Sequence, residues 1–234
     1  MTMKIGIIGA MDPEVDTLVN ELKHMKQHTI GYAILYEGEL CDHDVVIARS
    51  GIGKVCAGSI TAIMCAMYNV DCIVNTGCAG ALSPNLKIGD TVLATKVAFH
   101  DCDLTAFGYA KGQMANHPLY FEADQGLIRV AYDAADSLTD YKGTIHKGVI
   151  LTGDQFISNH DRKLELVEGF PEAMATEMEG AAIAQVASDF KKPFIVIRAI
   201  SDAASEGHTM TYEEFMPMAA ATSADLVSAM ISRM

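Results

Sequence analysis

Short apolar runs alternate with amphipathic stretches along the chain. The run Lys4–Gly9 is apolar, β-branched and closed by glycine, which is typical of a strand buried on both faces. Asp12 then offers an N-cap, Pro13 suits a first helical turn, and apolar residues recur at helical spacing from position 15 to 25. This pattern predicts a central strand, a short turn and a helix.

The alternation continues toward the C-terminus. Broken extended runs between residues 30 and 50 indicate hairpin strands, so we expect a mixed sheet. Further helices are predicted at 53–69, 123–138, 177–189 and 212–234, and further strands at 71–77, 91–98, 144–151 and 194–200. Together they predict an α/β fold, a three-layer α/β/α sandwich with a central mixed, twisted β-sheet. Because no linker or repeat divides residues 1–234, we expect a single domain.

One long segment shows neither the helical nor the strand periodicity of apolar residues. Residues 99–121 combine glycine, asparagine, proline, histidine and aromatic residues without periodicity. Connections of this length are uncommon in compact domains unless they line a site or an interface. We therefore expect a functional loop there.

Composition narrows the class of protein. The 234 residues are 50% hydrophobic and 20% charged, and 17 basic against 30 acidic residues give a net charge of −13. Such a field repels a phosphate backbone, so nucleic acid is not an expected partner. The longest apolar stretch, 58–82, is interrupted by Asn69, Asp71 and Asn75, so no membrane span is predicted. Six cysteines without a C-x-x-C pair, and a start without a cleavage site, predict a reduced, cytoplasmic protein.

Candidate chemistry gathers after the predicted strands, where α/β sheets collect their ligands. Glu14 follows the first strand, glycine-containing turns occupy Ser50–Lys54 and Gly77–Gly80, and Ser201 and Asp202 follow the last strand. Neither turn completes a dinucleotide fingerprint or a phosphate loop. Tight turns are therefore the simpler explanation of the glycines taken alone.

Charged residues lie near the ends of two predicted elements, and at each place they can be interpreted in two ways. Glu177 and Glu179 stand at the start of an Ala-rich helix, where the helix dipole stabilises an exposed carboxylate by about 0.3–1 kcal/mol. A buried carboxylate needs hydrogen-bond partners, which the hydroxyls of a ligand could supply. Arg198 and Asp202 flank a strand end, either within a site or as a structural ion pair. The run 100–103 has consecutive acidic, His and Cys residues that point to opposite faces, so no metal is expected.

Seven blocks of sequence carry a resemblance to a known family. They are Gly9–Met11 with Glu14, Ser50–Lys54, Asn75–Gly80, Thr105–Tyr109, Gly153–Ile157, Glu177–Glu179 and Arg198–Asp202. In this order, over nearly the whole length, they resemble the 5′-methylthioadenosine/S-adenosylhomocysteine nucleosidases of the nucleoside phosphorylase superfamily. The resemblance implies hydrolysis of an N-glycosidic bond, with release of adenine and a 5-thioribose and without a metal or cofactor.

The resemblance also implies residue roles. Asp202 resembles the general acid that protonates adenine N7, oriented by Ser201, and Glu14 resembles the base that activates the attacking water. The implied substrate contacts are Glu179, Met178 and Arg198 at the ribose, Glu177, Cys78, Ala79 and Gly80 at further sugar or water positions, Phe156 and Ile157 at adenine, and Ile52, Tyr212 and Phe215 at the 5′-alkylthio group. Phe107 would reach the partner's pocket across a homodimer interface.

Three positions depart from the family pattern. Cys78 stands where Ser is often found, Ala81 replaces a Gly, and Tyr212 replaces a common Phe. The tyrosine adds a polar tip to the alkylthio pocket.

Two other functions stay open at this point. A nucleoside phosphorylase shares the fold but needs cationic side chains to bind phosphate. In this chain the N-terminal loop has no arginine, and Asn75 stands where such enzymes tend to carry one. Glu14 would also repel phosphate. Hydrolysis is therefore favoured. A non-catalytic nucleoside-binding protein would lack Glu14 or Asp202, and both are present. The preferred substrate stays open among methylthioadenosine, S-adenosylhomocysteine, 5′-deoxyadenosine and aminodeoxyfutalosine.

Overall fold

The computed structural model describes residues 2–138, 141, 143–202 and 212–234, with side chains from residue 216 onward in the last segment. Its strands are β1 (Lys4–Gly9), β2 (Lys23–Ile30), β3 (Ala33–Leu40), β4 (His43–Arg49), β5 (Cys72–Ala81), β6 (Thr91–Phe99), β7 (Phe121–Glu122), β8 (Ile145–Thr152), β9 (Ala173–Glu177) and β10 (Phe194–Asp202). Its helices are α1 (Asp12–Asn20), α2 (Lys54–Ala66), η1 (Thr105–Phe107), α3 (Gln125–Ala135), α4 (His160–Gly169), α5 (Gly180–Asp189) and α6 (Tyr212–Ile231).

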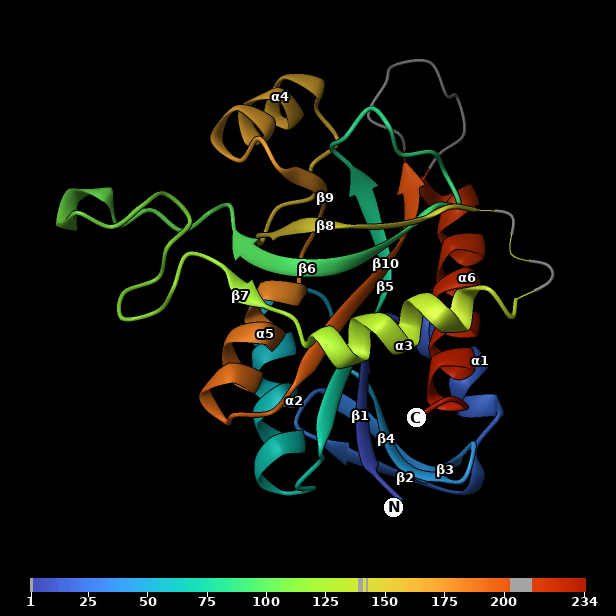
Figure 1. Cartoon of the computed structure of the whole chain (residues 1–234). Helices are drawn as coiled ribbons and strands as arrows, with labels where there is room; N and C mark the ends of the chain where they lie inside the picture. The colour runs from blue at the N-terminus through green and yellow to red at the C-terminus, as the bar shows by residue number, and fades with distance from the viewer. Residues whose placement is uncertain (1, 139–140, 142, 203–211) are drawn as a thin grey trace.

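The sheet is mixed, as predicted. In the described part of the chain it has ten strands (Figure 1). β4, β1, β5 and β10 pair in parallel, as do β6, β8 and β9, whereas β2–β3, β3–β4, β5–β9, β6–β7 and β6–β10 are antiparallel. Because β10 pairs with both β5 and β6, the strands β5, β9, β8, β6 and β10 close into a ring. β1, β4, β3 and β2 extend this ring as an open sheet.

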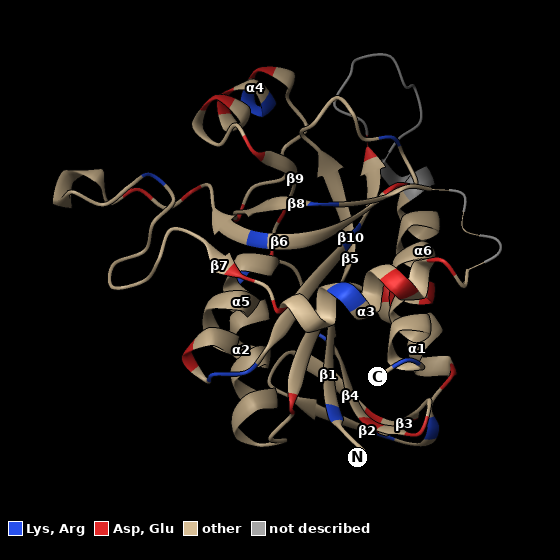
Figure 2. Ribbon diagram, in the orientation of Figure 1, with Lys and Arg blue, Asp and Glu red and all other residues tan. Residues whose placement is uncertain are grey.

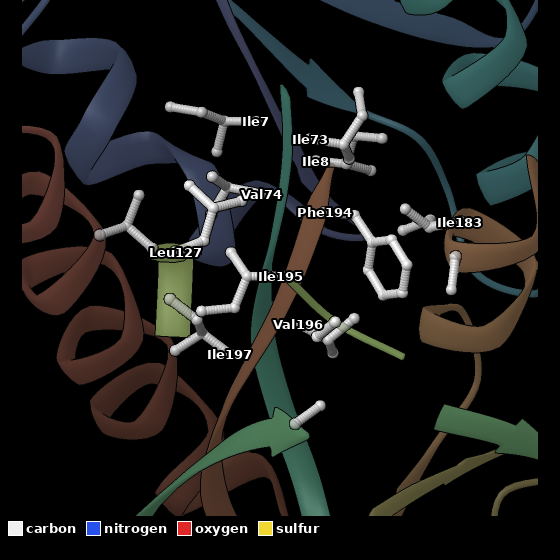
Figure 3. Close-up of a cluster of buried hydrophobic side chains, with 14 of the residues drawn as sticks. Ile7, Ile8, Ile73, Val74, Leu127, Ile183, Phe194, Ile195, Val196 and Ile197 are labelled. Atoms are coloured by element: carbon white, nitrogen blue, oxygen red, sulfur yellow. The ribbon is translucent and has the colours of Figure 1, made fainter. Parts of the chain in front are cut away.

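Helices cover both faces of the open part, which confirms the predicted three-layer arrangement. α2 packs with α5 on one side, and α6 packs with α1 and α3 on the other (Figure 1). β10 shows how one strand serves both layers, since successive side chains of a strand point to opposite faces. Phe194 and Val196 lie on the side of Ile183 from α5, whereas Ile195 and Ile197 lie on the opposite side (Figure 3).

The first helix is shorter than its apolar spacing predicts. It ends at Asn20, and the helical prediction through residue 25 is wrong because β2 begins at Lys23 and pairs with β3. Met25 is 49% exposed on this edge strand, so backbone pairing rather than side-chain burial fixes its conformation. Asp12 is not the N-cap either: Met11 is, and the Asp12 carboxylate accepts two hydrogen bonds from Arg49 at 2.7 and 2.8 Å.

β7, α4 and β9 lie where the pattern predicts no element. α4 and β9 occupy part of the stretch between β8 and α5, and α4 buries only Lys163 and Leu166. So weak an apolar stripe explains why periodicity does not reveal the helix. The loop predicted at 99–121 is confirmed, interrupted mainly by the single turn η1. Within the described ranges, no helix is both long and apolar enough to cross a bilayer.

Candidate active site

A cavity of about 360 Å³ opens where the carboxyl ends of β1, β5, β9 and β10 meet. Its volume lies within the range usual for small-molecule sites. It is lined by Ala10, Met11, Glu14, Ile52, Cys78, Ala79, Gly80, Gln155, Phe156, Ile157, Thr176, Glu177, Met178, Glu179, Arg198, Ser201 and Asp202. All but three of the predicted site residues are therefore brought together here.

Backbone amides hold the Glu14 carboxylate at one end of the cavity. Glu14 lies in the first turn of α1 and is 1% exposed. Its Oε2 accepts hydrogen bonds from the backbone N–H groups of Ala10 (2.7 Å) and Met11 (3.0 Å). Its Oε1 accepts from the Cys78 amide at 3.2 Å, and the Cys78 thiol lies 3.6 Å away. Donors on both oxygens fix the direction of the carboxylate.

Arg198 on β10 gathers the buried acids. Its guanidinium forms a close ion pair with Glu177 and lies 3.3 Å from Glu179 Oε2 and 4.0 Å from Glu14 Oε1. Burial alone would lower the pKa of Arg198, but the surrounding carboxylates raise it above its ordinary value. Gly77 is required beside this cluster, because a Cβ there would run into the Arg198 guanidinium and the Glu14 carboxylate.

Glu177 and Glu179 do not both begin a helix, so that prediction is wrong in detail. Glu177 ends β9, and Glu179 is the N-cap residue of α5. Glu177 is satisfied within the protein: it accepts hydrogen bonds from the Thr152 hydroxyl, from the amides of Glu179 (2.9 Å) and Gly180 (2.8 Å), and from Arg198. Glu177 therefore holds neighbouring elements together and also lines the cavity.

Glu179 has fewer protein partners than Glu177. Its Oε1 accepts a hydrogen bond from the Gly53 amide at 2.8 Å, and it is 4% exposed. Burial raises its pKa to about 7, against the opposing pull of Arg198, and the charge of Glu177 adds to the rise. A carboxyl in this state exchanges hydrogen bonds readily with a ligand hydroxyl, because it serves as donor or acceptor.

Asp202 lies at the other end and is not paired with Arg198, so the ion pair considered from the sequence does not form. Its Oδ2 lies 2.7 Å from the Lys163 ammonium of α4, and 32% of its side chain is exposed. Gly80 makes room for it, because a Cβ at that position would lie 2.9 Å from Asp202 Oδ1. The neighbouring Ser201 hydroxyl donates to the Ala79 carbonyl at 3.4 Å.

A charged network fixes the segment that carries Phe156 and Ile157. The Lys54 ammonium lies 2.7 Å from Asp101 and 3.7 Å from Asp154, and the Lys54 amide donates to Asp154 Oδ1 at 2.8 Å. The Asp154 amide in turn donates to Asp101 at 2.9 Å. Asp101 therefore pairs with a lysine of the glycine turn. In the described part of the chain, no group of acidic, His or Cys residues has the arrangement of a metal site.

Comparisons with known proteins identify the family. A model described as the phosphorylase superfamily matches residues 4–232. A 5′-methylthioadenosine/S-adenosylhomocysteine nucleosidase from Tolumonas auensis is 44% identical over 232 residues, which cover 99% of this chain and 100% of the relative. The chain belongs to the 5′-methylthioadenosine/S-adenosylhomocysteine nucleosidase family.

Solved structures extend this assignment. The nucleosidase of this family from Neisseria meningitidis, in complex with methylthio-immucillin-A, has a TM-score of 0.95 and 40% identity, covering 99% of this chain and 100% of that one. The futalosine hydrolase of Helicobacter pylori has a TM-score of 0.92 and 33% identity, covering 100% of this chain and 99% of that one. The fold predicted from the family resemblance is confirmed.

Three predicted residues of this nucleosidase-family chain are not seen in the cavity. Phe107 lies on η1, is 78% exposed and does not line it. η1 belongs to the segment between β6 and β7 that projects from the body of the molecule (Figure 1). The side chains of Tyr212 and Phe215 lie outside the described residues.

Lys163 and Asn75 are among the partners of the site that sequence reasoning missed. Lys163 lies on the unpredicted helix α4, and nothing in the local sequence separates it from solvent-exposed lysines. No contact was predicted for Asn75, yet its side chain accepts from Arg198 at 2.8 Å and donates to the Ile8 carbonyl at 2.9 Å. A polar residue inside an otherwise apolar buried strand was the available signal for Asn75.

Proposed function

We propose that this chain hydrolyses the N-glycosidic bond of 5′-methylthioadenosine and S-adenosylhomocysteine, releasing adenine and the corresponding 5-thioribose. The observation that carries the proposal is one cavity, in a nucleosidase-family chain, that is lined by both Glu14 and Asp202. Cleavage of a glycosidic bond passes through an oxocarbenium-like transition state, and it needs an acid for the leaving group and a base for water.

Asp202 is the proposed acid. Its protonated carboxyl gives its proton to N7 of adenine as the bond from C1′ to N9 breaks, so adenine leaves as a neutral molecule. Gly80 permits the close approach of Asp202 to β5, and Ser201 supports the strand end through its bond to Ala79.

Glu14 is the proposed base. Its three amide donors fix the carboxylate in place, and as the base it holds a water molecule and takes its proton during attack on C1′. Glu14 contacts β5 at Cys78 and Asp202 contacts it at Gly80, which are two residues, or about 7 Å, apart along the strand. Acid and base on separate carboxylates with water between them give inversion at C1′.

The buried acids are proposed to serve the ribose. Glu179, with the Met178 backbone, binds the hydroxyls, and Arg198 holds Glu177 and Glu179 in place. Three carboxylates around one guanidinium leave the cluster with excess negative charge when all are ionised. That charge favours the positive charge that develops on the sugar in the transition state.

The base and the 5′ group are proposed to lie against the apolar residues of the cavity. Phe156 stacks on adenine and the Ile157 backbone binds its edge, while Ile52 contacts the alkylthio group. Phe156 is 61% exposed and Ile52 is 55% exposed, so both offer apolar surface for a ligand to cover. Tyr212 and Phe215 complete this proposal as family expectations.

Hydrolysis is favoured over phosphorolysis by the placement of positive charge. Among the described residues that line the cavity, Arg198 is the cation, and its guanidinium already binds carboxylates. A phosphate would find no unengaged guanidinium there and would meet the charge of Glu14.

The test is release of adenine from methylthioadenosine in phosphate-free buffer, followed by chromatography. The expected result is the same rate without phosphate, with phosphate and with arsenate. Release that requires phosphate would make the protein a phosphorylase, and binding of methylthioadenosine without turnover would make it a nucleoside-binding protein.

Aminodeoxyfutalosine is a second proposed substrate. The likeness to the Helicobacter pylori futalosine hydrolase favours it, because that structure covers the whole of this chain. Parallel measurements of kcat/KM for the four candidate adenosyl compounds rank the substrates directly. A kcat/KM for aminodeoxyfutalosine below one hundredth of that for methylthioadenosine would remove it from the list.

A homodimer is proposed around the projecting loop. Phe107 is exposed and does not line the cavity of the candidate site, which suits a residue that completes the site of a partner. Light scattering should give twice the chain mass, and Phe107→Ala should raise KM more than it lowers kcat. A monomer with full activity would contradict this. The cytoplasmic location expected from the sequence stays a prediction.

A further inference from the structure

Lys163 contacts the proposed general acid directly. Its ammonium lies 2.7 Å from Asp202 Oδ2, and the residue is only 7% exposed. Neighbouring charged residues of α4, such as Asp161, Glu165 and Glu168, face solvent, and Figure 2 shows both charge signs on this helix. Lysines are almost never this buried unless they are paired. The Lys163 ammonium of α4 therefore lies away from solvent and contacts Asp202.

The surroundings of Asp202 leave Lys163 as its charged neighbour in the described part of the chain. β5 faces Asp202 with Gly80, which has no side chain, and α4 faces it with Lys163. The other charged groups that line the cavity are bonded to one another around Arg198. Among the described residues, an effect of charge on Asp202 should therefore come mainly from Lys163.

We propose that Lys163 is a positioning residue that orients the general acid and sets its working pH. The proposal rests on the function proposed above. Lys163 holds Oδ2, which leaves Oδ1, against Gly80, as the oxygen that meets adenine. A neighbouring ammonium also stabilises an ionised carboxylate, so it favours the state that Asp202 reaches after it gives up its proton.

The reaction balances without any change in Lys163. The proton of Asp202 passes to N7, the electron pair of the C1′–N9 bond stays with adenine, and the water oxygen bonds to C1′ while its proton passes to Glu14. Lys163 keeps its own proton throughout. From this ion pair we expect activity to fall off at a lower pH with Lys163 than without it.

The test compares pH profiles of kcat/KM for methylthioadenosine. Lys163→Met removes the charge at similar length, Lys163→Arg keeps it, and Lys26→Met removes a charge from the exposed strand β2 as a matched control. For Lys163→Met we expect kcat/KM at the pH optimum to fall about tenfold. We also expect the decline of kcat/KM at high pH, the basic limb of the profile, to begin about one pH unit higher. Lys163→Arg should keep the limb of the wild type, and Lys26→Met should reproduce its whole profile.

A double variant separates this role from a structural one. In an Asp202→Asn background, Lys163→Met should cause no further loss, because Lys163 acts through Asp202. A merely structural lysine would lower activity in both backgrounds and leave the limb in place, and that result would overturn the inference. Should Lys163→Met fail to fold by circular dichroism, Lys163→Gln serves in its place. A wild type that releases no adenine overturns the proposed function itself, whereas an active wild type with an unmoved variant profile overturns only this inference.

Discussion

The two ends of the cavity hold charge in opposite ways. At one end Arg198, Glu14, Glu177 and Glu179 are each less than 10% exposed and are bonded to one another or to backbone amides. At the other end Asp202 keeps 32% of its side chain exposed and is held by one lysine of a neighbouring helix. The difference suits the proposed chemistry. The buried groups, the proposed base Glu14 among them, are locked in place, and the proposed acid, which must regain a proton every turnover, lies where water reaches it.

We expect the largest loss of catalysis from a substitution at the exposed end of the cavity. Asp202→Asn removes the proposed acid while keeping the shape of the side chain, so kcat should fall by about 10²–10⁴-fold. Adenine binding should stay measurable by calorimetry. A variant that keeps most of its kcat would contradict the assignment of the acid.

The buried end should respond in stability instead. Arg198→Met leaves buried carboxylates without their cation, and breaking a buried pair in this way costs about 3–5 kcal/mol. Lys163→Met breaks a pair whose acid can turn to water, so its cost should be about 1 kcal/mol or less. Urea unfolding of both variants at one pH measures the difference. Equal losses would mean that the two ends are not distinct.

The buried end should also make stability depend on pH. The pKa of Glu179 is raised by burial from 4.5 to about 7 in the folded chain, so the folded state binds a proton that the unfolded state releases. Its contribution is therefore fully present below about pH 4.5 and is lost as the pH rises through about 7. The gap between the two pKa values corresponds to about 3 kcal/mol.

Glu179→Gln provides the control for this measurement. The free energy of unfolding of the wild type, relative to the variant, should fall between pH 5 and pH 8.5, because Gln cannot ionise. Urea titrations at four pH values in that range give the difference directly. A difference that does not vary with pH would show that Glu179 titrates normally.

Much of the site could be predicted because strand ends are readable in the sequence. Gly9 and the Ser201–Asp202 pair end apolar β-branched runs, and parallel strands bring such ends together. The turn predicted at Gly77–Gly80 is wrong, because these residues lie inside β5, which continues to Ala81 and pairs with β10. The family resemblance then supplied roles that spacing alone could not. Glu177 illustrates the limit: the sequence indicated that its buried carboxylate needs partners, but only the fold shows that Thr152 and Arg198 provide them.

The missed features share a physical cause. β2 is held by backbone pairing with β3 while its side chains face solvent, so no hydrophobic period marks it. α4 buries two side chains, one of them Lys163, whose partner lies 39 residues away along the chain. Closure of β5, β9, β8, β6 and β10 into a ring likewise depends on pairing between distant strands. Local pattern cannot encode any of these contacts.

The smallest expected effect concerns the departure from the family at position 78. The Cys78 thiol is a weak donor 3.6 Å from Glu14 Oε1, an oxygen that already accepts from the Cys78 amide at 3.2 Å. In Cys78→Ser the hydroxyl is a stronger hydrogen-bond donor than the thiol, but it reaches less far toward Glu14. We therefore expect kcat to change by no more than about threefold, equivalent to less than 1 kcal/mol. Steady-state kinetics with methylthioadenosine check this. A loss above tenfold would show that the thiol, rather than the backbone, orients the proposed base.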